Sequence, residues 1–417
     1  MKIPRPFYLN QLISGMGNGF IKIATGLRRC GKSYLLFSLF TDYLKESGVD
    51  DSHILKIDLE DIRNIELRDP IKLVRHIDGK MKDSSTYYIL LDEVQHVEGF
   101  VDVLNSYLKI ENADVYVTGS NSKFLSSDIV TEFRGRGDKI HLYPLTFAEI
   151  YSVKGGDKAE LWRDYMTFGG LPHVQSLDTY QKKATYLRNL YRTVYLKDLK
   201  ERNKISKAGE FDELVHIVAS SIGSPCNPTK LANTFRSVGK SELSRQTVAT
   251  YLEYMEDAFL IKKAQRYDVK GKRYINTLSK YYHTDIGVRN AILDFRQQEE
   301  THIMENIIYN ELLARGYSVD VGMIEVKGRG ADNEWFRRQF EVDFVVNMAS
   351  KRYYIQSALA IPDKEKMRQE SASLRNIGDA FRKIIIVRDY INPWYTEDGI
   401  LVLGLFDFLL NPESIDY

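Results

Sequence analysis

Two glycines, a lysine and a serine near the N-terminus have types and spacing suited to phosphate chemistry. The stretch GLRRCGKSYLL, residues 26–36, places Gly26, Gly31, Lys32 and Ser33 in the pattern G-x-x-x-x-G-K-S. Glycines let backbone N–H groups close around an anion, lysine supplies a cation, and the serine hydroxyl can bind a divalent metal. The pattern predicts a phosphate cradle, against the alternative of a plain strand-to-helix turn.

The residues around Lys32 extend this predicted site, and its expected ligands are ATP and Mg²⁺. Backbone N–H groups of the loop would face the phosphates, and the helix expected after Ser33 would add the positive end of its dipole. The nucleotide-binding residues expected in this stretch are Gly26, Arg28, Arg29, Cys30, Gly31, Lys32, Ser33 and Tyr34.

Two adjacent acids, Asp92 and Glu93, follow the apolar run YYILL at residues 87–91. A buried strand would deliver Asp92 to the carboxyl end of a sheet, where it would bind the metal together with Ser33. Glu93 would then polarise the water that attacks the γ-phosphate. One acid would favour binding or switching, whereas two favour hydrolysis. The alternative is a solvated acidic start of a helix.

Polar residues after the next apolar run, VTGSNS, include Ser120 and Asn121, either of which could sense the γ-phosphate. The segment FRGRGDK then offers Arg134 and Arg136. Charge that develops on a transferred phosphoryl group is stabilised by an arginine, often from a neighbouring subunit. We expect one of these arginines to do so, against the alternative of a solvated basic turn.

The elements that must position these residues alternate along roughly the first 150 residues. Apolar runs at residues 20–26, 53–59, 87–94, 113–122 and 139–151 predict strands, the last with a proline stop. Residues 34–48 have helical spacing and end in glycine. Strands alternating with helices predict a parallel, doubly wound sheet.

Length, charge and cysteine content set the wider limits. A chain of 417 residues is too long for one core, so two or three domains are expected. The net charge of +1 excludes a global attraction to nucleic acid or acidic membranes, so such binding would need a local patch. Two cysteines suit a reducing compartment. With no signal sequence and no long apolar run, a cytoplasmic protein without membrane contact is expected.

The order of several motifs resembles prokaryotic ATPases of the AAA+ superfamily. The chain is similar to proteins that join an AAA_14 ATPase domain to a C-terminal DUF4143 domain, near the archaeal ATPase and STAND branches. The resemblance covers nearly the whole chain and implies a P-loop ASCE core, a helical lid, a winged-helix-like segment and a domain similar to PD-(D/E)XK nucleases. The motifs are RPFYLNQLI, ATGLRRCGKS, LLDEVQ, VTGSNSKFLSSD, FRGRGDKIHLYPLTFAEIY, FGGLPHV and YLKDLKERNKI.

The resemblance implies an α/β fold in four parts. These are a P-loop ATPase core at residues 1–155, a helical lid at 156–205, a winged-helix-like domain at 206–290 and a DUF4143-type domain at 291–417. In related branches a G-x-P in the lid touches the adenine, and Gly170-Leu171-Pro172 matches it. Pro172 is therefore an implied nucleotide contact, against the alternative of a helix-capping turn.

The middle segment, residues 227–285, predicts helix, turn, helix, strand, turn and strand. This order looks like a winged helix, whose second helix would present Arg245, Gln246 and Thr250 to the major groove of double-stranded DNA. The alternative is a structural or protein-binding module, because Tyr251 and Tyr254 do not look groove-facing. The basic hairpin that could hold phosphates carries Lys262, Lys263, Arg266, Lys270, Lys272 and Arg273.

The C-terminal segment carries part of a nuclease pattern. Nucleases of the PD-(D/E)XK type bind Mg²⁺ through carboxylates from a helix and two strands and use a lysine in an E-x-K step. Glu305 and Asp343 fit, but Gln356 replaces the next carboxylate and alanine replaces the lysine. An E-x-K at residues 325–327 precedes Asp343 and has the wrong order, so a rearranged site is the alternative. We predict a nuclease-like fold without nuclease activity.

In that inactive domain, the acids of the strand around Asp343 need other partners. We expect ion pairs of Glu341 and Asp343 with nearby arginines, for which the candidates are Arg337, Arg338 and Arg352.

The leading functional prediction is a Mg²⁺-dependent ATPase whose nucleotide state moves the lid and the C-terminal modules. Its expected catalytic residues are Lys32, Asp92, Glu93, Arg134 and Arg136. The alternatives are a nucleotide-gated binding module with negligible turnover and an ATP-gated, metal-dependent nuclease. Double-stranded DNA or a protein is the expected partner, and an arginine acting between subunits would require an oligomer.

Overall fold

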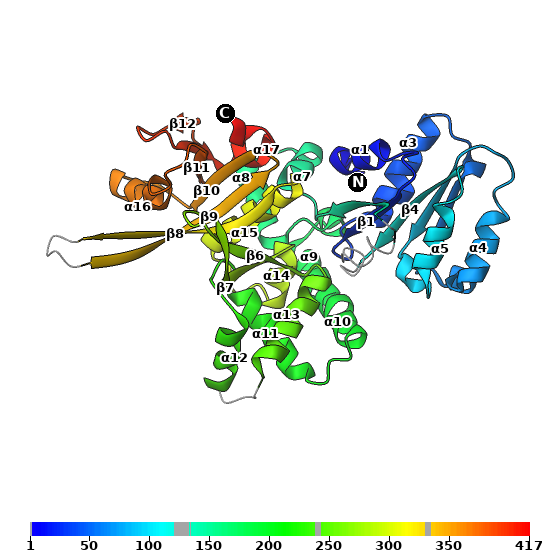
Figure 1. Ribbon diagram of the computed structural model, residues 1–417, viewed down its shortest axis with the longest axis horizontal. Coiled ribbons are helices and arrows are strands. Elements are labelled where there is room, and N and C mark those ends of the chain that lie inside the picture. The colour runs from blue at the N-terminus through cyan, green and yellow to red at the C-terminus, as the bar shows by residue number, and fades with distance from the viewer. Residues whose placement is uncertain (1, 121–132, 134, 238–242, 330–334) are drawn as a thin grey trace. The chain divides into compact units, whose positions relative to one another are not determined.

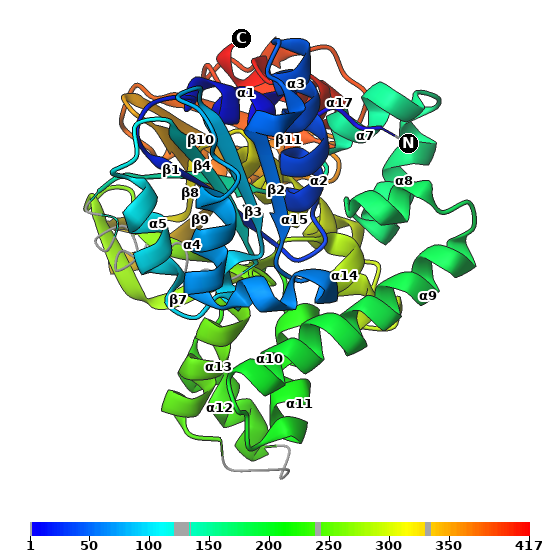
Figure 2. The ribbon, with the colours of Figure 1, turned by 90° about the vertical axis from the view of Figure 1, so that its right-hand side faces the viewer.

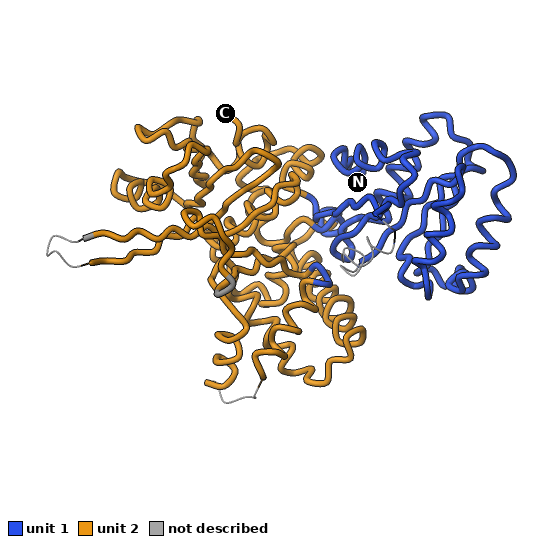
Figure 3. The backbone as a smooth tube through the Cα atoms, viewed as in Figure 1, with its two compact units in different colours: residues 1–145, 171–176, 257–259 blue, residues 146–170, 177–256, 260–417 orange. Residues whose placement is uncertain are grey.

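The structure is a computed structural model that describes residues 2–120, 133, 135–237, 243–329 and 335–417. The chain forms two compact units (Figure 3). Unit 1 contains residues 1–145, 171–176 and 257–259, and unit 2 contains residues 146–170, 177–256 and 260–417. Among the described residues, no helix combines the length and apolar character needed to cross a membrane.

Unit 1 is built on a five-stranded parallel sheet with the order β2-β3-β4-β1-β5. This arrangement confirms the predicted α/β fold with a parallel sheet. Strand β4 lies between the strand that precedes the cradle, β1, and the strand that ends in the acids, β3. The strands are β1 (Ile21–Gly26), β2 (Ile54–Asp58), β3 (Tyr87–Asp92), β4 (Ala113–Gly119) and β5 (Gly137–Leu142).

Helices cover both faces of this sheet (Figure 1). On one face α4 and α5 pack on an apolar core that includes Ile23, Ile89 and Leu104. On the other face the ring of Phe40 lies 4.5 Å from that of Tyr116. The helices are α1 (Pro6–Ser14), α2 (Lys32–Tyr34), a π-helical continuation (Leu35–Phe40), α3 (Thr41–Glu46), α4 (Pro70–Asp78) and α5 (Phe100–Tyr107), with 3-10 helices at Asp51–His53, Ile62–Arg68 and Val94–His96.

The predicted strand at residues 139–151 ends at Leu142, before the proline. The chain then turns helical, because the Thr146 hydroxyl accepts from the Glu149 N–H and the Glu149 carboxylate accepts from the Thr146 N–H. This reciprocal capping box starts α7 (Phe147–Lys154) in unit 2.

Along the chain, most helices of unit 2 come after the last strand of the first sheet and before the first strand of the second. The helices that follow flank the second sheet (Figure 2). Helix α14 is buried along its whole length and contacts α8 and α9. The helices after α7 are α8 (Lys158–Phe168), α9 (Tyr180–Leu190), a π-helical segment (Tyr191–Leu196), α10 (Lys197–Arg202), α11 (Ala208–Ser220), α12 (Pro228–Ser237), α13 (Arg245–Asp257), α14 (Ile286–Ile292), α15 (Glu300–Ala314), α16 (Lys364–Arg375) and α17 (Leu405–Leu410).

The second sheet has eight strands in the order β12-β13-β11-β10-β9-β8-β6-β7. The hairpin β6–β7 pairs with β8, so the segment predicted as a wing shares one sheet with the C-terminal strands. Before α12, Cys226 also forms an antiparallel bridge with Ser279 of β7. The strands are β6 (Ile261–Asp268), β7 (Arg273–His283), β8 (Ser318–Arg329), β9 (Trp335–Met348), β10 (Lys351–Ala358), β11 (Arg382–Val387), β12 (Trp394–Tyr395) and β13 (Leu401–Gly404).

Candidate nucleotide-binding site

The loop between β1 and α2 has a backbone that only a few residue types adopt. Gly26 has φ of +147°, and a Cβ placed on it would lie 2.2 Å from the carbonyl oxygen of Leu142. Gly31, which caps α2, has φ of +105°, and Arg29 has φ of +68°. Glycine adopts such conformations without a steric penalty, which explains both glycine positions of the motif. The result is a tight loop that ends at the amino terminus of a helix.

Lys32 reaches back into this loop. Its side chain is buried, and its Nζ donates to the carbonyl oxygens of Gly26 at 3.1 Å and Leu27 at 3.3 Å. The nearest carboxylate oxygen, Oε1 of Glu93, lies 3.9 Å from Nζ. The ammonium group is therefore held mainly by neutral carbonyl groups, and anionic phosphate oxygens are stronger acceptors than these.

Asp92 lies at the end of β3, with 4 % of its surface exposed. Its Oδ1 accepts a hydrogen bond of 2.5 Å from the Thr118 hydroxyl, and the Ser33 hydroxyl also bonds to the carboxylate. Burial raises the pKa of Asp92, and these two hydroxyl groups partly oppose that rise. A carboxylate and a hydroxyl group, both hard oxygen ligands, thus meet beside the loop, as Mg²⁺ requires.

Glu93 follows in a left-handed conformation, with φ of +51°. Its backbone N–H donates to the Thr118 hydroxyl at 2.9 Å, and its Oε2 accepts from the Gln95 amide. Burial alone would raise the pKa of Glu93, but the Lys32 ammonium and hydrogen bonds from Gln95 and Ser120 outweigh it and lower the pKa. The carboxylate is therefore ionised at neutral pH, as a general base must be.

Thr118 and Gln95 are parts of this arrangement that sequence reasoning missed. The Thr118 hydroxyl bridges the two acids, since it donates to Asp92 and accepts from the Glu93 backbone. The Gln95 amide lies between Glu93 and Ser120, whose Oγ is 3.5 Å from Nε2. The pairing of Leu91 with Val117 in neighbouring parallel strands places Thr118 level with Asp92. Strand alignment was therefore the available signal for Thr118.

Other residues predicted along the loop make protein contacts. Arg28 forms an ion pair with Glu60. The Cys30 thiol is buried against the Leu142 carbonyl at 3.6 Å, and burial raises its pKa. The Tyr34 hydroxyl is buried with no hydrogen-bond partner in the described part of the chain. The Cys30 side chain faces the protein interior, and its backbone N–H donates to the Leu27 carbonyl at 3.1 Å, so the phosphate contact of Cys30 stays a prediction.

Pro172 lies beside the loop. It begins a short 3-10 segment, Pro172–Ser176, that belongs to unit 1. A Cβ placed on Gly31 would lie 3.6 Å from the Cγ of Pro172, an ordinary van der Waals distance. The structure thus brings Pro172 next to the phosphate loop, while its contact with the base stays a prediction.

The structure tests one of the two predicted arginines, Arg136, and does not place it at this site. Asn121 and Arg134 lie outside the described residues. Arg136 precedes β5, where Ile21 pairs with Gly137, whereas the loop leaves β1 at the other end, where Gly26 pairs with Leu142. At roughly 3.3 Å per residue, these edges of the sheet are separated by about 17–20 Å. Arg136 therefore cannot reach the phosphate loop of its own chain.

Comparison with known protein families gives two matches. Residues 18–151 match the AAA domain family AAA_14, and residues 159–299 match a domain of unknown function, DUF8612. The first match confirms the predicted AAA_14 domain. Neither match is the DUF4143 domain predicted for residues 291–417, which stays a prediction.

Relatives extend the likeness along the chain. The chain is 34 % identical to an uncharacterized protein of Haemophilus influenzae over 98 % of both chains. The chain belongs to the family of that protein. The chain is also 28 % identical to the uncharacterized protein MJ1544 of Methanocaldococcus jannaschii, and the match covers 86 % of this chain and 79 % of that relative. Together with the loop and its acids, the AAA_14 match makes residues 18–151 a P-loop ATPase domain.

Two solved structures are also similar to the chain described in this structure. The Walker-type ATPase PABY2304 of Pyrococcus abyssi is 14 % identical, with a TM-score of 0.49 over 70 % of this chain and 96 % of that one. Cdc6p from Pyrobaculum aerophilum is 13 % identical, with a TM-score of 0.30 over 73 % and 94 % of the two chains.

In unit 2, the predicted remnant of a nuclease site contains a lysine that sequence reasoning missed. Lys280 of β7 places its buried Nζ 2.8 Å from Glu305 of α15, 2.8 Å from Glu341 of β9 and 3.9 Å from Asp343. We call these four residues the Lys280 cluster. The predicted pairs with arginines are wrong, because Lys280 is the cation that these acids contact. Among the described residues, no group of three or more His, Cys, Asp or Glu side chains is arranged to hold a metal ion.

The polar groups of the Lys280 cluster bond to one another and to neighbouring protein groups. Burial and the nearby Glu305 raise the pKa of Asp343 to about 8, although Lys280 opposes this. Asp343 also accepts from the Ser357 backbone at 2.8 Å. Gln356, predicted to replace the missing carboxylate, accepts from Ser373 of α16 at 3.3 Å and forms no hydrogen bond with the Lys280 cluster in the described part of the chain.

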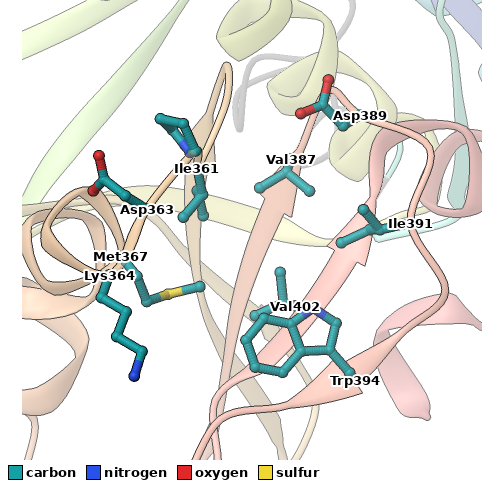
Figure 4. A pocket seen from close by; sticks show the side chains of 10 residues that line it. Ile361, Asp363, Lys364, Met367, Val387, Asp389, Ile391, Trp394 and Val402 are labelled. Atoms are coloured by element: carbon teal, nitrogen blue, oxygen red, sulfur yellow. The ribbon is translucent and has the colours of Figure 1, made fainter.

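One further cavity, of about 350 Å³, lies at the carboxyl ends of β10 and β11 (Figure 4). Its wall is apolar and includes Met367, Ile391, Trp394 and Val402. Its polar members, Asp363, Lys364 and Asp389, do not converge on one point in Figure 4. No residue predicted from sequence for a site lines it, so it does not contribute to the nucleotide chemistry.

Proposed function

We propose that this protein is a Mg²⁺-dependent ATPase. The observation that carries the proposal is the convergence within unit 1 of Lys32, Ser33, Asp92 and an ionised Glu93 on one edge of the parallel sheet. Thr118 fixes the relative positions of the two acids. A module that only binds nucleotide needs the cradle and the metal ligands. Hydrolysis also needs a general base, and the ionised Glu93 beside them can serve as one.

Each residue of this edge has a role that follows from its contacts. Lys32 would exchange its carbonyl partners for phosphate oxygens. Ser33 and Asp92 are the residues that would hold Mg²⁺, which when bound neutralises charge on the phosphates. Glu93 would accept a proton from water as the water oxygen bonds to the γ-phosphorus and the bond to the β–γ bridging oxygen breaks.

The test is steady-state phosphate release with Mg²⁺-ATP. Glu93→Gln and Lys32→Ala should each lower turnover about 100-fold or more, since a general base or an electrostatic contact to the transition state contributes that much. Glu98→Gln is the matched control, because Glu98 is an exposed acid of the same segment. Glu93→Gln should still bind ATP. Wild-type turnover in Glu93→Gln would remove the role assigned to Glu93.

A nucleotide-gated binding module with negligible turnover is the second candidate. It is favoured by the Gln95 amide, which engages the Glu93 carboxylate that hydrolysis needs. In that case the purified protein would carry nucleotide, and its slow phosphate release would equal that of Glu93→Gln.

We further propose that the nucleotide state moves the lid at residues 156–205 and the modules that follow it. Supporting this, residues 171–176 belong to unit 1 although the chain on both sides belongs to unit 2. Pro172, beside Gly31, therefore lies on a segment covalently continuous with the lid helices. Double-stranded DNA or a protein is the proposed partner, and stimulation of phosphate release by added DNA would identify the former.

The C-terminal domain is proposed to be a nuclease-like module without nuclease activity. This rests on Lys280, which places an ammonium group among the carboxylates where such a nuclease would bind metal. Incubation of duplex DNA with Mg²⁺ or Mn²⁺ should leave it intact. Metal-dependent cleavage that disappears in Asp343→Ala would overturn this proposal.

A further inference from the structure

Strands β8 and β9 continue beyond their neighbours as a two-stranded hairpin, which Figure 1 shows running out from the rest of unit 2. Strand β6 pairs only with residues 321–323 of β8, and β10 pairs only with residues 344–348 of β9. In the described ladders residues 325–329 pair only with residues 335–339, and Phe340 at their base pairs with Ile324. We call residues 325–329 and 335–340 the arm.

The arm is basic and carries exposed aromatic rings. It contains four basic residues and one acid, in a chain whose net charge is only +1. Trp335 is 73 % exposed and Phe336 is 45 % exposed. An exposed aromatic group beside several cations is a composition expected of a nucleic-acid surface. The charged residues are Glu325, Lys327, Arg329, Arg337 and Arg338.

A second basic hairpin begins beside the base of the arm. Strands β6 and β8 are parallel, and the Val269 N–H donates to the Met323 carbonyl at 3.0 Å. The turn that follows β6 therefore leaves the sheet in the same direction as the arm. This turn exposes Lys270, Lys272 and Arg273. The two hairpins together concentrate positive charge at one end of one sheet.

Contacts within the arm hold its shape. The Phe336 ring covers Gly328, since a Cβ placed on that glycine would lie 2.7 Å from the ring. The Arg338 guanidinium lies 5.0 Å from the centre of the Phe340 ring. Arg337 pairs with Glu325, the single acid of the arm. The arm is therefore a preformed ribbon, and one acid cannot neutralise its cations.

We propose that the arm, together with the β6–β7 turn, binds the phosphate backbone of double-stranded DNA. A two-stranded ribbon fits the major groove, which is about 12 Å wide. Five residues of strand extend about 17 Å, enough to follow the groove past its phosphates. A protein interface would instead be depleted in charge at its centre. This inference goes beyond the proposed ATPase function and does not depend on ATP hydrolysis.

The test measures binding of the full chain, without nucleotide, to a fluorescently labelled duplex over a range of salt concentrations. The double variant Arg337→Gln/Arg338→Gln should weaken binding about tenfold or more. It should also reduce the slope of log Kd against log salt by about 1.8, because each phosphate contact that is lost lowers this slope by about 0.9. The matched control is Lys364→Gln/Arg368→Gln, which removes two exposed cations from α16 and should bind as the wild type does.

Three outcomes would overturn the proposal. The first is arm-variant binding equal to that of the control, with wild-type ATP turnover showing that the variant is folded. The second is loss of binding only in Arg245→Gln/Lys262→Gln, which would assign DNA to the winged-helix-like segment. The third is self-association that the arm variant abolishes while its DNA affinity stays at the wild-type value, which would make the arm an interface between copies of the chain.

Discussion

Replacement of Lys280 by methionine tests whether an ammonium group holds the C-terminal sheet together. Methionine keeps much of the chain length but leaves Glu305, Glu341 and Asp343 without their cation. Of the side chains that the structure describes, the Tyr282 hydroxyl would still donate to Glu305, at 2.6 Å. Removing one partner of a buried ion pair costs about 3–5 kcal/mol.

The positions of the three acids decide where in that range the loss should fall. Glu305 is buried and has its 2.8 Å contact with Lys280 to lose. The Glu341 side chain is 31 % exposed, so water compensates part of its loss. Asp343, with a pKa of about 8, is largely protonated at pH 7 and loses little. We therefore expect Lys280→Met to lower the unfolding free energy by about 3 kcal/mol at pH 7.

The destabilisation should depend on pH with a definite sign. Without the lysine, the pKa values of the carboxyl groups rise in the folded state. The folded protein then binds more protons than the unfolded protein, so the variant becomes less stable as the pH rises. The gap between wild type and Lys280→Met should therefore be larger at pH 8 than at pH 5. In the wild type, Asp343 contributes stability that is present below its ordinary pKa of 3.8 and lost as the pH rises to about 8.

Urea unfolding followed by tryptophan fluorescence is the suitable assay, because Trp162, Trp335 and Trp394 all belong to unit 2. Lys351→Met is the matched control, since its pair with Asp416 is solvent-exposed and contributes little to stability. The double variant Lys280→Met/Glu305→Gln should recover part of the loss. Equal stability of Lys280→Met and wild type at pH 8, or a gap that does not change with pH, would refute the reasoning.

Three more predictions concern the nucleotide site. Thr118→Val should destabilise unit 1 by about 1–3 kcal/mol and slow phosphate release, because it leaves the Glu93 N–H unpaired and removes one of two hydroxyl donors to Asp92. Thr118→Ser keeps the hydroxyl and should do neither; equal effects of the two variants would contradict this. Gln95→Ala removes a bond that lowers the pKa of Glu93, so the acid limb of the pH–rate profile should move to higher pH; an unchanged profile would count against it. If Arg136 acts between chains, Arg136→Ala should be inactive and mixing it with inactive Glu93→Gln should restore turnover, whereas wild-type turnover of Arg136→Ala alone would remove this role.

Much of unit 1 could be predicted from sequence because its motifs are short and contiguous. The loop from Gly26 to Ser33 and the pair Asp92–Glu93 each lie within one segment, so spacing alone indicates their chemistry. Apolar runs that alternate with helices likewise predict the parallel sheet, since its inner strands β1, β3 and β4 are buried on both faces. Thr118 is different, because its role depends on the alignment of β4 with β3.

The Lys280 cluster shows why unit 2 was harder to predict. Its members come from β7, α15 and β9, and no local pattern links these elements. The predicted arginine partner Arg337 is six residues from Asp343 along one strand, a distance of about 20 Å. It pairs instead across the hairpin with Glu325, while Arg352 donates to Asn347 at 2.8 Å. Charge pairing in a sheet follows register, which sequence spacing does not report.

Lys32 and Lys280 are both buried near acids, and yet the contacts of their ammonium groups differ. Lys32 is bonded to two neutral carbonyl groups, with its nearest carboxylate oxygen at 3.9 Å, so anionic phosphate oxygens can replace its partners at a net electrostatic gain. Lys280 already has two carboxylate oxygens at 2.8 Å, and a phosphate or metal would have to break those contacts inside the protein. The Lys32 site should therefore bind its ligand, and the Lys280 cluster should bind neither phosphate nor metal. Nucleotide should stabilise unit 1 against unfolding, whereas Mg²⁺ alone should leave the tryptophan-monitored unfolding of unit 2 unchanged.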